Sequence, residues 1–87
     1  MKTPRARADV VLRPVGRDWV LYDPRTRDLH LLNITAALTW DLLDGTLTEA
    51  EIVGQIRELV REAPPAPVVE EDVRGAIRDF DQKGLLA

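Results

Sequence analysis

The stretch from residue 31 to residue 45 most constrains how this chain can fold, because the hydrophobic period changes there from that of a strand to that of a helix. Beyond the change, apolar residues recur at four-residue steps, at Ile34, Leu38 and Leu42. Asn33 is a good N-cap, and Gly45 can end a helix in a left-handed conformation. We therefore expect a short helix, apolar nearly all round and buried, directly after a strand.

Three strand-like segments precede this helix. Residues 9–15 are strand-like but contain Pro14, which confines the segment to a sheet edge or a strand end. Residues 17–22 alternate, and residues 29–32 follow after an Asp-Pro turn signal at residues 23–28. Strands in direct succession, joined by such turns, predict a small antiparallel meander.

Two further helices follow. Thr48 and Glu51 have the spacing of a capping box, which opens an amphipathic helix that we expect to reach Glu62. Its apolar face comprises Ile52, Val53, Ile56, Leu59 and Val60. The prolines of residues 63–67 predict a stiff, extended connector. The acidic residues 70–72 then fit the first turn of a third helix, where the helix dipole favours them. The apolar stripe of that helix comprises Val69, Val73, Ala76, Ile77 and Phe80.

The predicted order is therefore three strands followed by three helices, an α+β fold with the layout of a winged helix-turn-helix domain. Its 87 residues fit one domain. We expect a flexible N-terminal tail over residues 1–8 and a single domain over residues 9–87. No apolar run approaches the roughly 20 residues of a membrane span, so a cytoplasmic protein without a membrane partner is expected.

Residues suited to catalysis are scarce. The chain has no cysteine and a single histidine, His30, which lies among leucines in a predicted strand. No spacing suggests a zinc site or a nucleophile–base pair, and no glycine-rich phosphate loop is present. We expect neither enzymatic activity nor a metal or other cofactor.

The winged-helix layout raises the alternative of a DNA-binding regulator. Residues 70–83, which would form the third helix, carry five acidic and three basic side chains. Phosphate contacts by cations dominate affinity for DNA, so this charge argues against a nucleic-acid partner. A structural subunit of a larger enzyme complex is a further alternative.

A strand at residues 29–32 has another use if it lies at the sheet edge, because its free N–H and C=O groups can pair with an extended peptide. The groove between this edge and the third helix would be lined by Asp28, Leu29, His30, Leu31, Val73, Arg74, Ile77, Arg78 and Asp81. The alternative is that the apolar members fill the core and that the arginines lie on a solvated helix face.

Several motifs of the chain resemble the PqqD-like family, over about residues 9–86. They are the segments Val20–Pro24 and Leu29–Leu32, the string Leu-Asn-Ile-Thr-Ala of residues 32–36, Trp40, the Leu-Leu-Asp-Gly of residues 42–45, the Glu-Asp-Val of residues 71–73 and the Gly-Leu-Leu of residues 84–86. Members of this family are chaperones of pyrroloquinoline quinone (PQQ) biosynthesis, or recognition elements for ribosomally made precursor peptides.

The resemblance implies a non-catalytic peptide chaperone. It would bind the leader of a precursor peptide as a strand added to the third strand, bounded by the third helix, and present it to a modifying enzyme. In the quinone pathway that enzyme is a radical SAM protein. On this basis we expect Arg74 and Arg78 to pair with acidic leader residues, and Leu29 and Leu31 to border its apolar anchors.

Overall fold

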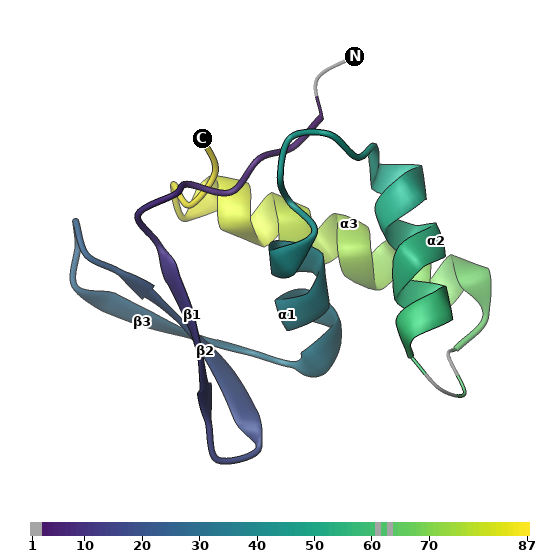
Figure 1. The fold of residues 1–87 in the computed structure, drawn as a ribbon, viewed down its shortest axis with the longest axis horizontal. Coiled ribbons are helices and arrows are strands. Elements are labelled where there is room, and N and C mark those ends of the chain that lie inside the picture. Colours follow the sequence, from purple (N-terminus) through teal and green to yellow (C-terminus); the bar gives the residue numbers. More distant parts are fainter. Residues whose placement is uncertain (1–2, 61, 63) are drawn as a thin grey trace.

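The computed structural model describes residues 3–60, 62 and 64–87. It contains the elements β1 (Val11–Val15), β2 (Asp18–Asp23), β3 (Asp28–Leu32), α1 (Ile34–Asp41), α2 (Glu49–Leu59) and α3 (Ala66–Gln82). The predicted α+β fold of three antiparallel strands followed by three helices is confirmed. The sheet lies on one side of α1 and α2 on the other, while α3 runs behind them (Figure 1).

Helix α1 connects the sheet to the other two helices. The Asn33 side chain accepts a hydrogen bond from the Ala36 N–H at 2.8 Å, so the predicted N-cap is confirmed. The helix packs against β2, β3, α2 and α3. Its buried Trp40 meets Phe80 of α3 edge-to-face, with ring centroids 5.2 Å apart and an angle of 82° between the rings. This geometry is favourable for aromatic pairs, and it fixes α1 against α3.

The end and the burial of α1 differ from the prediction. The helix ends at Asp41, and Leu42 is its C-cap. Gly45 lies in the turn beyond, where its φ of +87° suits glycine and a Cβ atom would stand 3.2 Å from the Arg5 side chain. Helix α1 is also not buried all round, since Ile34 is more than half exposed. The exposed residues of α1 are Ile34 and Asp41, at its two ends.

The sheet has the order β1-β2-β3, so β1 and β3 are its two edges. The edge position expected for Pro14 is thereby confirmed. Directly opposed residues of antiparallel strands point to the same face. The inner face, toward the helices, therefore carries Leu12, Pro14, Trp19, Leu21, His30 and Leu32. The outer face carries Val11, Arg13, Val20, Tyr22, Leu29 and Leu31.

Helix α2 begins as predicted and ends early. The Thr48 N–H donates to the Glu51 carboxylate at 3.0 Å, and the Glu51 N–H donates to the Thr48 hydroxyl at 3.2 Å, which confirms the capping box. The helix was expected to reach Glu62, but it stops at Leu59 because Val60 has an extended backbone. As a result, Leu59 is largely exposed and does not belong to the apolar face.

Helix α3 begins earlier than predicted. Pro65 is its N-cap and Pro67 lies in its first turn, so the expected extended connector is wrong at residues 66 and 67. Proline is compatible with the first turn of a helix, where its missing N–H has no partner to lose. The acidic residues 70–72 consequently lie beyond the first turn, which contains no acidic residue. The explanation from the helix dipole is wrong for them. Ala63 lies outside the described residues.

A flexible N-terminal tail was expected over residues 1–8, of which residues 1 and 2 lie outside the described part of the chain. Within the rest, the Ala6 N–H donates to the Leu43 carbonyl at 2.8 Å and the Arg7 N–H to the Leu85 carbonyl at 3.0 Å. The Ala87 N–H in turn donates to the Arg5 carbonyl at 2.8 Å. These bonds join segments far apart in the sequence, and hydrophobic periodicity does not reveal such pairing.

Replacing Trp40 with alanine should destabilise the domain by about 3–5 kcal/mol, because the cavity lies between α1 and α3. Urea unfolding followed by circular dichroism measures this loss, and Trp40→Phe, with a smaller loss, serves if the alanine variant does not fold. Leu59→Ala is the control, since an exposed substitution should change the free energy of unfolding by at most about 0.5 kcal/mol. Equal losses for the Trp40→Ala and Leu59→Ala variants would contradict the central position of α1.

Candidate functional site

The free edge of β3 is the most distinctive surface of the fold. Within the described part of the chain, β3 pairs only with β2. Along an edge strand, N–H and C=O groups of alternate residues point away from the sheet and can pair with another strand. The side chains of Leu29 and Leu31 are 69% and 71% exposed beside these groups. This edge therefore offers both main-chain hydrogen bonds and apolar surface.

The other edge, β1, is less suited to strand addition. It has the sequence VLRPV, in which Pro14 has no N–H to donate and Arg13 adds a charge. Proline and charged residues are common means of blocking an edge strand. The sequence of β3 is DLHLL, which keeps an N–H at each of its five positions and contains no lysine, arginine or proline. The β3 edge is thus the more open of the two to a partner strand.

The sequence-predicted residues of β3 divide between the two faces of the sheet. Leu29 and Leu31 lie on the outer face, opposite Tyr22 and Val20. His30 lies on the inner face opposite the buried Leu21 and is itself partly buried. Asp28 is exposed at the start of the strand. A peptide paired with β3 would contact Leu29 and Leu31 on one side and His30 on the other.

Two of the predicted residues of α3, Val73 and Arg74, lie away from this edge. Val73 is completely buried in the core. Arg74 forms ion pairs with Glu70, at 2.8 Å, and with Glu49 of α2, at 3.5 Å. The flank of α3 that carries Arg74 therefore faces the start of α2.

Two more of the predicted residues follow the same flank. Ile77 and Asp81 line an open pocket of about 500 Å³ that also contains Thr48 and Glu49. Arg78 is exposed on α3. Of the residues expected in one groove, those of β3 thus lie at the sheet edge and Val73 lies in the core. Arg74, Ile77 and Asp81 lie on the α2 side of α3.

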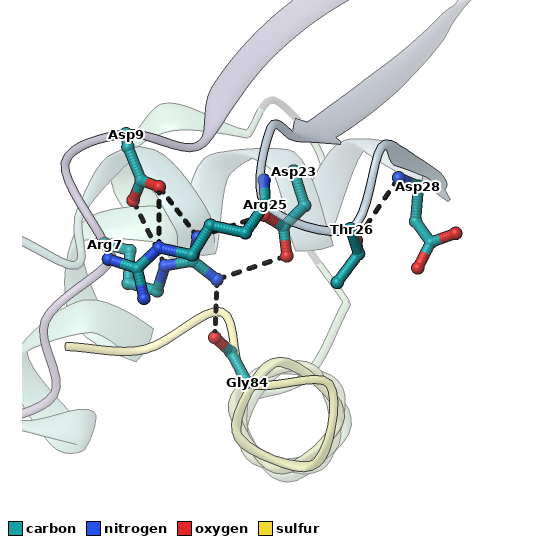
Figure 2. A network of polar contacts seen from close by, with 7 residues as sticks. All are labelled: Arg7, Asp9, Asp23, Arg25, Thr26, Asp28 and Gly84. Atoms are coloured by element: carbon teal, nitrogen blue, oxygen red, sulfur yellow. Dashed lines mark hydrogen bonds and ion pairs between the residues drawn. The ribbon is translucent and has the colours of Figure 1, made fainter.

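A partly buried ion-pair network, which the sequence did not reveal, holds the turn between β2 and β3. The Arg7 guanidinium donates to both carboxylate oxygens of Asp23, at 3.1 and 3.0 Å, and to both of Asp9, at 3.1 and 2.8 Å. It also donates to the Gly84 carbonyl at 2.9 Å. Figure 2 shows Arg7 between the two carboxylates, next to the end of α3. One side chain thereby ties the N-terminal segment, the hairpin and α3 together.

The charges of this network are strongly coupled. Hydrogen bonds from the Arg7 guanidinium hold the pKa values of Asp9 and Asp23 below their usual range, and the two carboxylates raise the pKa of Arg7. Asp23 also accepts from the Arg25 N–H at 2.9 Å, which orients the turn that leads into β3. The network therefore sets where β3 begins relative to α3. Sequence reasoning assigned Asp23 to a loop, and no spacing pattern connects it to Arg7.

Within residues 3–60, 62 and 64–87, no three His, Asp or Glu side chains are grouped so that they would hold a metal ion. Over the same residues, no helix has the length and apolar character required to cross a membrane.

Acid should destabilise the domain partly through Arg7 and Asp23. Because the pKa of Asp23 is lowered in the folded state, its stabilising contribution is present above the ordinary carboxyl pKa of about 4 and is lost as the pH falls through the folded-state value. Urea unfolding at pH 6 and pH 3 should show a smaller acid-induced loss for Asp23→Asn than for the unchanged protein.

Asp9→Asn is the matched variant, since its side chain is 38% exposed against 2% for Asp23. At pH 6, Asp9→Asn should lower the free energy of unfolding less than Asp23→Asn does. It can still be measured if the Asp23→Asn variant does not fold. Asp44 and Glu51, whose pKa values hydrogen bonds with Thr46 and Thr48 lower, respond to acid in every variant. An unchanged acid response in both variants would contradict the role of the network.

Comparison with known proteins agrees with this fold. The chain matches the structure titled "TbiB1 in Complex with the TbiA(beta) Leader Peptide" with a TM-score of 0.73 and 27% sequence identity, covering 94% of this chain and 93% of that one. It matches "Lasso peptide synthetase B1 complexed with the leader peptide" with a TM-score of 0.76 and 20% identity, covering 98% of both chains, which shows a shared fold.

The sequence comparisons differ in outcome. No curated protein matches the chain significantly. The model of the family described as "Coenzyme PQQ synthesis protein D (PqqD)" matches residues 18–86, which include all of the fold except β1 and the N-terminal segment. The chain therefore belongs to the PqqD family.

Proposed function

We propose that this protein binds the leader of a ribosomally made precursor peptide as an extended strand added to β3. The open edge of β3 is the observation that carries the proposal, because it is the sheet edge without proline or basic residues. Two further findings support it. The chain belongs to the PqqD family, and the similar TbiB1 was solved with a leader peptide.

The physical basis is β-augmentation. Main-chain hydrogen bonds to the outward N–H and C=O groups of β3 supply affinity, and side chains on both faces of the edge supply specificity. The five residues of β3 span about 17 Å, so they accommodate a segment of about five leader residues. Because Arg7 fixes the β2–β3 turn, the edge is ordered before the peptide arrives, which lowers the entropic cost of binding.

The domain itself is proposed to be non-catalytic and cofactor-free and to act in the cytoplasm. It presents the bound leader to a separate modifying enzyme, which supplies the chemistry. That enzyme is a radical SAM protein if the chain serves quinone synthesis, and an enzyme of another class if it serves a different modified peptide. The acidic residues 70–72 are exposed on α3, which disfavours the alternative of a DNA-binding regulator.

An NMR titration of the ¹⁵N-labelled protein tests the proposal. The ligands are leader segments of precursor peptides encoded beside its gene, and the expected amide shifts concentrate on residues 28–32. Shifts confined to the pocket beside Ile77 and Asp81 would contradict strand addition at β3. No shifts with any leader, but shifts with a neighbouring enzyme, would indicate a structural subunit instead.

A proline variant of β3 tests the proposed main-chain hydrogen bonds between β3 and the leader. His30 and Leu31 are neighbours in β3, so the N–H of one points toward β2 and that of the other points outward. Proline at the outward position should preserve the sheet and weaken leader binding at least about threefold, as expected for one lost hydrogen bond. Circular dichroism identifies which variant keeps the fold. Unchanged affinity of the folded variant would contradict strand addition.

Arg74→Glu is the control on α3. Because Glu49 and Glu70 hold Arg74 on the side of α2, reversing its charge should leave leader affinity within about twofold, a free-energy change of about 0.4 kcal/mol. A larger loss would show that the leader continues onto α3. The pairing of Arg78 with an acidic leader residue remains a prediction, and Arg78→Glu tests it in the same titration.

A further inference from the structure

The outer face of the sheet carries rows of side chains that end at the open edge of β3. One row runs from Val11 through Tyr22 to Leu29, and the next row ends with Val20 and Leu31. Opposed side chains in such rows lie about 4.5–5.5 Å apart at Cβ and cover one another. The helices lie on the other side of the sheet, so this face is open (Figure 1).

Among the apolar side chains of these rows, exposure is greatest at β3. In the first row, Val11 and Tyr22 are each 36% exposed, whereas Leu29 is 69% exposed and Leu31, at the end of the second row, is 71% exposed. Tyr22 has a lateral neighbour on each side, but the two leucines have one only on the side of β2. A strand added beyond β3 would place its own side chains beside them.

We infer that the outer face forms part of the leader-binding surface and selects leaders with two apolar residues separated by one residue. These two residues would lie beside Leu29 and Leu31, while the residue between them would face inward, beside His30. The inference rests on the proposed function, and it adds a sequence preference to it. Each apolar cross-strand pair should contribute about twofold to fivefold in affinity.

The distribution of side chains favours a strand over a flat protein surface as the occupant. A folded partner on the outer face would also cover Arg13, in the centre of β1, and Val15 and Asp18 beyond it. The most exposed leucines of the sheet lie on β3, next to the free main-chain groups. One added strand would cover both leucines and satisfy those groups at the same time.

A displayed library of random 12-residue peptides, selected against the protein, tests the inference without a known leader. Binders that shift the amides of residues 28–32 are kept, and their sequences are aligned. Apolar residues at positions separated by one residue should be enriched. The double variant Leu29→Ser, Leu31→Ser should bind these peptides about fourfold to twenty-fivefold more weakly, since two pairs are lost.

Two controls test whether the loss of affinity comes from contacts between the peptide and the two leucines of β3. Val15→Ser removes an exposed apolar side chain of the outer face on the far edge strand, and it should change affinity less than twofold. Replacing the two apolar peptide residues with serine should weaken binding to the unchanged protein but not to the double variant.

The outcomes separate the inference from the proposed function. Peptides that bind β3 without the apolar spacing, or without loss in the double variant, would overturn the inference and leave the proposed function intact. An equal loss for Val15→Ser would also overturn it, because a partner would then cover the whole outer face. If no peptide shifts residues 28–32, the proposed function fails and the inference fails with it.

Discussion

The contact between Trp40 and Phe80 joins α1 to α3 in the core of this small domain. Helix α1 has only eight residues, and isolated helices of that length are not stable in water, so α1 depends on its packing. It packs against two strands and two helices, and the aromatic pair joins it to α3. The position of the sheet relative to α3, and with it the surroundings of the β3 edge, depends on this short helix together with the Arg7 network.

The two edge strands of the sheet, β1 and β3, differ in how well they could pair with another strand. Pro14 and Arg13 make β1 a poor template for another strand, whereas the main chain of β3 remains open beside two exposed leucines. An open apolar edge normally invites aggregation. Its presence in an otherwise well-packed domain is understandable if a partner strand covers it, as we propose for a leader peptide.

Local signals made much of the fold predictable from sequence. Asn33 and the pair Thr48 and Glu51 act within one turn of a helix, and the structure confirms both caps. Long-range relations were not predictable. The stripe of α3 identified its buried side, but no pattern shows which neighbour lies on each flank, so Arg74 was expected near β3 and instead contacts α2. Proline is also compatible both with an extended connector and with the first turn of a helix, and the sequence alone does not distinguish the two. In the structure, Pro67 lies in the first turn of α3.

The Arg7 side chain has a consequence for how the protein is made. Its hydrogen bond to Gly84 joins residues that are 77 positions apart. During synthesis, Arg7 and Asp23 therefore leave the ribosome long before Gly84 does. At about 5–20 residues per second, the delay lasts seconds. Closing so long a loop is slow compared with forming a local hairpin. The two carboxylates of the network, close to Arg7 in the sequence, would shield its charge until α3 is complete.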